Sequence, residues 1–303
     1  MIQSPELDSP EKQVLASMSA LLAKAGLGYQ GKFVEFDGRR VHYLEYGEGP
    51  AVLLLHGAGA GSAIWFRQIE ILSKNRRVIV PDHPVFGLSH QRAYESPIND
   101  SLVRYVTGFM DATGLHTVDV IALSMGAQAA LAVAIEFPKR FGKIVLIDSA
   151  GLGKAFPLIF KLATLPVFGS LVVRPNRWGQ DSYFKNWEVV NSEFEDAELY
   201  RQYAYDVTLT VRHAHAMRAS LRVITDLSGQ KSVFTDYELR SIVNPTLVIW
   251  GAHDKVFPLE HGHRLAQHAP NSSLYVVENS AHVPLLDNPD EVNDLACGFL
   301  SAN

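Results

Sequence analysis

The sequence is poor in the features that define several large protein classes. It has one cysteine, Cys297, in 303 residues, so the chain cannot form an internal disulfide. A single thiol suits a reducing compartment, which supports the expectation of a cytoplasmic protein. Cys297 lies in the apolar pattern "EVNDLACGFL", and we expect it to be a buried structural thiol rather than a nucleophile.

Charge is also scarce. Charged residues make up 19% of the chain, and the net charge of −5 comes without a long basic run. This balance argues against nucleic acid as a partner. Hydrophobic residues make up 47%, which is enough to form a large buried core.

No long uninterrupted hydrophobic run is present. The first residues, "MIQSPELDSPEKQ", lack the basic start and the apolar core of a signal peptide. The most apolar long stretch, "GLGKAFPLIFKLATLPVFGSLVV", contains lysines and prolines, which argues against a membrane span. We therefore expect no stable membrane insertion, and the sequence leaves the oligomeric state open.

The chain does contain a regular alternation of strands and helices. After a predicted hairpin around Asp37 and Gly38 come apolar strands such as "AVLLL", "KIVLI" and "TLVIWG", separated by helical segments. Uninterrupted apolar strands are typical of a parallel sheet that is covered by helices on both faces. The pattern predicts an α/β fold with an open, mostly parallel sheet and an antiparallel N-terminal hairpin.

This alternation breaks between residues 152 and 243, where prolines, aromatics and helical patterns replace it. We call residues 152–243 the insertion segment and predict that it is a mostly helical lid subdomain. The core would then comprise residues 31–151 and 244–303. Residues 1–30 would form an N-terminal helical extension that packs on the body of the protein.

A serine marks the point where "VDVIALSMGAQAALAVAIEFP" changes from a strand to a helix pattern. A serine on a tight strand-to-helix turn exposes its Oγ above the carboxyl edge of the sheet. The small neighbours Ala122 and Gly126 of Ser124 fit such a turn. Because the chain reads A-L-S-M-G where G-x-S-x-G is usual, a serine that caps a core helix is the alternative.

A second signal is "LLLHGAGAGSAIW", in which small residues follow an apolar strand. Small residues let backbone amides approach a ligand closely, so we interpret this loop as an oxyanion loop and His56 as a residue that shapes it. Neither G-x-x-x-x-G-K-[ST] nor G-x-G-x-x-G fits, because Ser62 occupies the third glycine position. No cofactor is expected. No metal is expected either, because His213 and His215 would project from different faces of a helix.

Two further polar residues follow the last two predicted strands. Asp254 comes just after "TLVIWG" and His282 comes just after "SLYVVE". The carboxyl ends of parallel strands form the ligand-binding edge of an open α/β sheet, so both are predicted to lie near Ser124. Asp148, which follows "KIVLI", competes with Asp254 for the position of the acid, and we favour Asp254.

The order Ser124, Asp254, His282 resembles that of the α/β-hydrolase superfamily over about residues 31–301. "PDHPVFGLS" is similar to the D-x-P-G-x-G-x-S segment of many members, with Val85 where glycine is usual. "HGAGAG" and "SMG" look most similar to esterases and to meta-cleavage product hydrolases, which cleave carbon–carbon bonds of vinylogous diketone acids. The second group usually has tryptophan after the catalytic histidine, whereas Val283 stands here.

The resemblance and the motifs together predict a cofactor-independent hydrolase of carboxylic esters with small to medium apolar acyl groups. Ser124 would be the nucleophile, His282 the base and Asp254 the residue that orients it, with the amides of Ala58 and Met125 as the oxyanion hole. The expected partner is a small-molecule ester. The alternatives are a carbon–carbon bond hydrolase with the same triad, a non-catalytic ligand-binding protein on this fold, and acyl transfer or perhydrolysis.

The insertion segment would place apolar side chains over Ser124, a few of which are expected to line an acyl pocket. Its arginines are expected to be solvated, and one that faced Ser124 would favour a substrate with a carboxylate. The apolar candidates are Phe156, Leu158, Phe160, Leu165, Val167, Phe168, Trp178, Tyr183, Phe184 and Trp187, and the arginines are Arg174, Arg177, Arg212 and Arg218.

Overall fold

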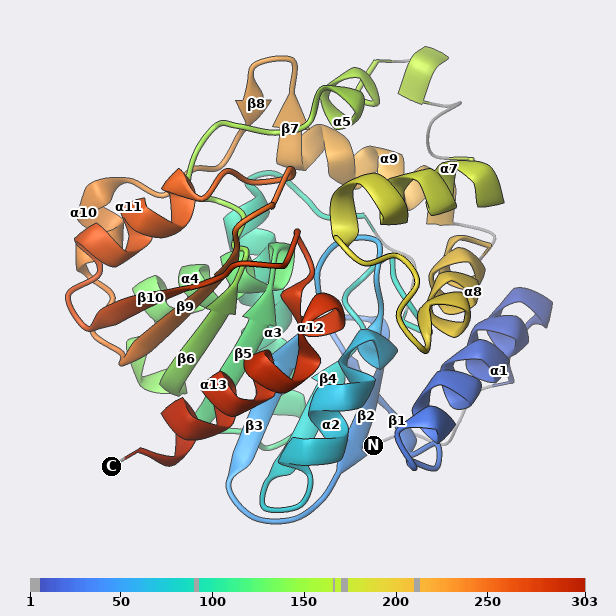
Figure 1. Cartoon of the computed structure of the whole chain (residues 1–303), viewed down its shortest axis with the longest axis horizontal. Helices are drawn as coiled ribbons and strands as arrows, with labels where there is room; N and C mark the ends of the chain where they lie inside the picture. The colour runs from blue at the N-terminus through green and yellow to red at the C-terminus, as the bar shows by residue number, and fades with distance from the viewer. Residues whose placement is uncertain (1–5, 90–92, 166, 170–173, 210–212, 303) are drawn as a thin grey trace.

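The computed structural model describes residues 6–89, 93–165, 167–169, 174–209 and 213–302, and for residues 213 and 214 it describes the backbone alone. The predictions for Arg212 and for the side chain of His213 lie outside this description. Figure 1 shows the whole chain as one body with a central twisted sheet.

The sheet has eight strands in the order β1-β2-β4-β3-β5-β6-β9-β10. The antiparallel pairs are β1 with β2 and β2 with β4, while every pair from β4 to β10 is parallel. The predicted fold class is therefore confirmed. The strands are β1 (Gly31–Phe36), β2 (Arg39–Tyr46), β3 (Ala51–Leu55), β4 (Arg77–Pro81), β5 (Val118–Leu123), β6 (Phe141–Ile147), β9 (Thr246–Gly251) and β10 (Ser272–Val277).

The N-terminal hairpin turns at the predicted Asp37-Gly38 pair. Both residues have positive φ values, 51° and 64°, and a two-residue turn of this kind matches the twist of the strands that it joins. The hairpin extends the sheet at one edge, away from the ends of β5, β9 and β10 that carry the polar residues predicted above.

Helices cover both faces of the sheet. In Figure 1, α2 and α13 lie in front of the sheet, and α3 and α4 lie behind it. The central strands are buried between these layers, as their uninterrupted apolar pattern indicated. The helices are α2 (Phe66–Leu72), α3 (Ile98–Ala112), α4 (Met125–Glu136), α11 (Glu260–His268), α12 (Pro284–Asp287) and α13 (Pro289–Ser301), with short 3-10 helices η1 (Ser62–Trp65) and η2 (Pro138–Arg140).

The first helix, α1 (Ser9–Lys24), packs on the body of the protein. Asp8 caps it, because its side chain accepts a hydrogen bond from the amide of Glu11 while the Glu11 side chain accepts one from the amide of Asp8. Its buried side chains lie against α8 (Ala197–Thr208) of the insertion segment. These buried apolar residues are Val14, Met18, Leu21 and Leu22.

The insertion segment is mostly helical in its described parts. Figure 1 shows it above one end of the sheet. Its boundaries at residues 152 and 243, and its role as a lid, stay predictions. The segment contains α5 (Leu158–Leu162), α7 (Arg177–Tyr183), the π-helical turn η3 (Phe184–Glu188), α8, α9 (His213–Ile224), the two-stranded ribbon of β7 (Thr225–Asp226) and β8 (Gly229–Gln230), and α10 (Asp236–Arg240).

Within the described ranges, the structure contains no helix whose length and apolar composition would let it cross a bilayer.

Candidate active site

Ser124 sits on a strained turn between β5 and α4. Its backbone has φ 55° and ψ −115°, a conformation that non-glycine residues rarely adopt outside functional sites. The turn brings α4 so close to β3 that a Cβ on Gly126 would lie 2.3 Å from the carbonyl oxygen of Leu55. The close approach of α4 to β3 therefore explains the glycine in "SMG".

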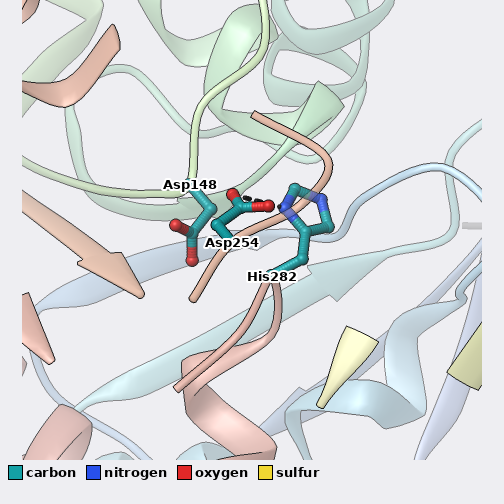
Figure 2. A group of neighbouring side chains, drawn as sticks. All are labelled: Asp148, Asp254 and His282. Carbon is teal, nitrogen blue, oxygen red and sulfur yellow. Dashed lines mark hydrogen bonds and ion pairs between the residues drawn. The ribbon is translucent and has the colours of Figure 1, made fainter. Parts of the chain in front are cut away.

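The structure brings the three predicted residues together in one hydrogen-bonded chain. The Ser124 hydroxyl lies 3.0 Å from Nε2 of His282, and Nδ1 of the same ring lies 2.9 Å from Oδ2 of Asp254. Figure 2 shows the ring of His282 turned toward the Asp254 carboxylate. With Nδ1–H donating to the carboxylate, Nε2 is the lone-pair nitrogen and accepts the hydroxyl hydrogen.

Asp254 is held as an acceptor by the loop that follows β9. Its Oδ1 accepts hydrogen bonds from the amides of Val256 at 2.7 Å and Phe257 at 3.0 Å, which leaves Oδ2 for His282. The Phe257 ring lies edge-on to the imidazole of His282, with the ring centroids 5.3 Å apart. The acid and the ring thus have fixed orientations before any substrate binds.

Asp148, the competing acid, lies beside Asp254 (Figure 2). It is fully buried, with its Oδ1 accepting from the amide of Gly251 at 3.0 Å and no hydrogen bond to His282 among the described contacts. Burial and then the Asp254 carboxylate raise the pKa of Asp148 well above its usual range. Burial therefore favours the protonated form of Asp148, and Asp254 is the carboxyl group that is hydrogen-bonded to the imidazole.

The same cluster has the donor types of a metal site. One ligand atom from each of Asp148, Asp254 and His282 lies within 4.8 Å of the others. However, Nδ1 of His282 is already bonded to Asp254, and the raised pKa of Asp148 disfavours the anionic form that a metal ligand needs, so these residues are not a set of free ligands. The expectation that no metal takes part stays a prediction.

The predicted oxyanion donors flank Ser124. Met125 is the first residue of α4, where backbone N–H groups have no partner inside the helix and favour negative charge. Ala58 lies in the loop after β3, and that loop passes so close that a Cβ on Gly57 would lie 3.0 Å from Cβ of Ser124. The roles of Met125 and Ala58 as donors stay a proposal.

His56 is fully buried and shapes the loop that carries Ala58. Its Nδ1 donates to the carbonyl oxygen of Gly57 at 2.7 Å, and its Nε2 accepts from the amide of His83 at 2.9 Å. Burial lowers the pKa of His56 below its usual value, so the ring is neutral and joins the ends of β3 and β4. Both ring nitrogens are occupied, which leaves neither free to act as a base.

Asp82 ties the same loop to the segment after β4. Its carboxylate accepts from the amide of Ser62 at 2.6 Å, from the amide of Leu88 at 2.9 Å and from Nδ1 of His42 at 2.7 Å. No sequence motif indicated that His42, from β2, would bind Asp82. Val85 occupies the position where many α/β-hydrolases have glycine. Its φ is 82°, a left-handed conformation that glycine adopts without strain.

Two arginines of the insertion segment are exposed. Arg174 and Arg177 face solvent, and the guanidinium of Arg177 lies 4.9 Å from the ring centroid of Tyr205. A residue that the sequence did not single out, Glu188, instead approaches the triad: its carbonyl oxygen accepts a 2.8 Å hydrogen bond from the amide of Val283.

Comparison with known proteins agrees with this fold. Residues 50–289 match the family model described as the alpha/beta hydrolase fold, and the chain belongs to this family. It is a hydrolase by its fold and its relatives.

Among curated proteins, the chain is 31% identical to a 2-hydroxy-6-oxo-6-phenylhexa-2,4-dienoate hydrolase of Comamonas testosteroni, over 86% of this chain and 91% of the relative. Among solved structures, the enzyme of the same name from Rhodococcus sp. strain RHA1 has a TM-score of 0.79 at 25% identity, over 90% of this chain and 99% of that chain. A carboxylesterase of Bacillus subtilis shares the fold, with a TM-score of 0.78 at 22% identity, over 98% of this chain and all of that chain.

Proposed function

We propose that the protein hydrolyses carboxylic esters with small to medium apolar acyl groups, through an acyl-enzyme intermediate on Ser124. The observation that supports this proposal most is the continuous chain of hydrogen bonds from Asp254 through His282 to Ser124. A serine placed on a strained turn beside a helix N-terminus adds to it.

In the first half of the reaction, the Ser124 oxygen attacks the ester carbonyl while Nε2 of His282 takes the hydroxyl proton. Asp254 stabilises the imidazolium that forms. The negative charge on the carbonyl oxygen is met by the amides of Met125 and Ala58, and loss of one such donor typically costs about 3–4 kcal/mol of activation free energy. His282 then gives its proton to the leaving alcohol, and the carbon–oxygen bond of the ester breaks.

In the second half, water attacks the acyl group on Ser124. His282 takes a proton from this water and returns it to Oγ of Ser124 as the acid leaves, so the enzyme is restored without a cofactor or a metal. The insertion segment would act as a lid over this site. Apolar residues such as Phe156, whose ring stacks on Phe257 at a centroid distance of 5.8 Å, would contribute to an acyl pocket.

A second candidate is hydrolysis of a carbon–carbon bond in a vinylogous diketone acid. It is favoured by the curated relatives, whose names describe hydrolases of dienoate, dienedioate and trienedioate compounds. Val283, where those enzymes usually have tryptophan, favours the ester instead. Non-catalytic binding, acyl transfer and perhydrolysis are the remaining alternatives, and a small-molecule ester in the cytoplasm remains the proposed partner and location.

The test is a panel of p-nitrophenyl esters from acetate to palmitate, assayed beside one vinylogous diketone acid, with wild type and Ser124→Ala. We expect turnover of the shorter and medium esters by wild type and none by the variant. Faster turnover of the diketone acid than of any ester would favour the second candidate. Reaction with neither substrate class, and no labelling of Ser124 by a fluorophosphonate, would favour a binding protein.

A further inference from the structure

Glu188 is a buried carboxyl group that the insertion segment places next to the catalytic loop. It ends the π-helical turn η3, and such turns occur often at functional sites. Glu188 is 7% exposed. Its backbone carbonyl oxygen accepts from the amide of Val283, the residue that follows His282, so Glu188 and the catalytic histidine are held in a fixed relation.

A second contact makes this relation rigid. Asp287 accepts hydrogen bonds from the amides of Val190 and Asn191, just after Glu188, and from the amide of Ala281, just before His282. The distances are 2.9 Å, 3.0 Å and 2.9 Å. One carboxyl group therefore joins the end of η3 to the loop that carries the catalytic base.

The Glu188 side chain faces polar groups from three elements. Tyr200 of α8 donates to its Oε2 at 3.4 Å. The charge of Glu188 also contributes to the raised pKa of Tyr183 of α7, and His282 of the catalytic loop lowers the pKa of Glu188. No lysine or arginine forms an ion pair with Glu188 among the described contacts. Burial raises the pKa of Glu188 to about 7, and His282 and the Tyr200 hydrogen bond oppose that rise.

An ionised Glu188 carries a negative charge without an ion-pair partner among the described contacts, and this charge interacts with His282, the base that must reach the scissile carbonyl. A second carboxylate on the acyl part of a substrate would then meet a like charge in a region of low dielectric constant, where repulsion is stronger than in water. A neutral acyl group would meet no such cost.

We propose that Glu188 is a specificity-determining residue that selects esters with an uncharged acyl group against esters whose acyl group ends in a carboxylate. The inference rests on the proposed ester hydrolysis and deepens it. It also predicts a direction for the pH dependence. Glu188 is mostly neutral below pH 7 and mostly ionised above it, so the selection strengthens as pH rises.

The test compares p-nitrophenyl pentanoate with mono-p-nitrophenyl glutarate, which have acyl chains of the same length and differ in the terminal carboxylate. The readout is the ratio of kcat/KM for the neutral ester to kcat/KM for the anionic ester, at about pH 6 and about pH 8.5. The substrate carboxylate is ionised at both pH values, and both esters use the same nucleophile and base. A change in the ratio with pH therefore reports a change in the protein charge that the acyl carboxylate meets. We expect the wild-type ratio to rise several-fold between the two pH values.

In Glu188→Gln, we expect the ratio at about pH 8.5 to fall about tenfold and to lose its pH dependence, as removal of one like charge predicts. The matched control is Glu193→Gln, since Glu193 is an exposed glutamate of the same segment and contacts Lys185 and Arg201. Its ratio should equal that of wild type.

A wild-type ratio that is the same at both pH values, or a Glu188→Gln ratio equal to the wild-type ratio, would overturn the inference while ester hydrolysis stands. No turnover of either ester by wild type would instead remove the proposed function. If Glu188→Gln does not fold, as circular dichroism would show, the wild-type pH series alone decides.

Discussion

The buried carboxyl group of Asp148 lies beside the Asp254 carboxylate, with their oxygens and the imidazole of His282 within 4.8 Å of one another. Of the two carboxyl groups, Asp254 is hydrogen-bonded to His282, and burial together with the Asp254 charge raises the pKa of Asp148 well above its usual range. The site therefore contains one carboxyl group that is bonded to the imidazole and, next to it, a second one whose ionisation is disfavoured by burial and by its neighbour's charge.

This pairing predicts the behaviour of Asp254→Asn. Loss of the acid in a Ser-His-Asp triad commonly lowers kcat by about 10⁴-fold. Here the neutral amide removes the Asp254 charge, which is the second cause of the raised pKa of Asp148, while burial, the larger cause, remains. The pKa of Asp148 should therefore fall, and the ionised fraction of Asp148 would stabilise the imidazolium in part. We expect a loss of about 10³-fold, and a further loss of about tenfold in the double variant Asp148→Asn/Asp254→Asn. Single-turnover kinetics with p-nitrophenyl acetate would measure both, and equal activity of the single and double variants would show that Asp148 gives no support.

Glu188 predicts a pH-dependent difference in stability. Its pKa is about 7 in the folded protein and 4.5 when unperturbed. Between these values the unfolded chain binds fewer protons than the folded one, so wild-type stability decreases as pH rises through this window. Glu188→Gln lacks this effect. Relative to wild type, its free energy of unfolding should therefore increase by roughly 3 kcal/mol from about pH 4.5 to about pH 8.

Urea denaturation of both proteins across that range measures the difference. A constant difference in unfolding free energy at all pH values would mean that Glu188 keeps an ordinary pKa in the folded protein. Glu193→Gln, in which an exposed glutamate changes, should show no such trend.

The contacts of Asp82 predict that its loss lowers both the stability of the protein and the order of the oxyanion loop. Burial, the largest influence, would raise the pKa of Asp82, but the nearby His42 and the amide hydrogen bonds outweigh it and lower the pKa. Asp82→Ala would leave the amides of Ser62 and Leu88 buried without acceptors. We expect the free energy of unfolding to fall by about 3 kcal/mol or more.

Because Asp82 holds the loop that carries Ala58, kcat should fall as well, even where the variant is fully folded. Asp294→Ala, at an exposed position of α13, is the control for removal of a carboxylate. Unchanged kcat in folded Asp82→Ala would show that the oxyanion loop does not depend on this anchor. Wild-type stability due to Asp82 should be lost as pH falls through its lowered pKa, since protonation removes the acceptor.

Two glycine substitutions distinguish the effect of a steric clash from the effect of helix propensity. In Gly126→Ala the new Cβ would lie 2.3 Å from the backbone oxygen of Leu55, so the strand and helix must separate, and both stability and kcat should fall. In Gly298→Ala, within α13, the new Cβ meets nothing within 4 Å. That variant should gain up to about 1 kcal/mol of stability from helix propensity and keep its activity. Thermal unfolding and esterase assays of both variants check this contrast, and tolerance of Gly126→Ala would contradict the close approach of α4 to β3.

Much of this arrangement could be predicted from local sequence pattern. Apolar strands predict burial between two helical layers, and residues that follow parallel strands must share one edge of the sheet. For this reason Ser124, Asp254 and His282 could be placed near one another without coordinates. The hairpin turn at Asp37 and Gly38 could be predicted in the same way, because it depends only on the backbone conformations that these two residues favour.

The remaining features depend on contacts between distant parts of the chain. The raised pKa of Asp148 arises from burial beside another carboxyl group. The approach of Glu188 to the loop that carries His282 arises from the packing of the insertion segment on that loop. His42 joins Asp82 from a strand 40 positions earlier in the chain. No periodicity or motif reports such contacts, since each side chain on its own is an ordinary histidine, aspartate or glutamate.

The central claim is that Ser124 becomes acylated with His282 as its base. The most direct measurement is intact-protein and peptide mass spectrometry after brief reaction with p-nitrophenyl butyrate in an acid quench, run beside a fluorophosphonate. We predict one added butyryl group on Ser124. Prior treatment with the fluorophosphonate should prevent this label, and Ser124→Ala should carry none. Turnover of the ester with no label on Ser124, or with full activity in Ser124→Ala, would contradict the account.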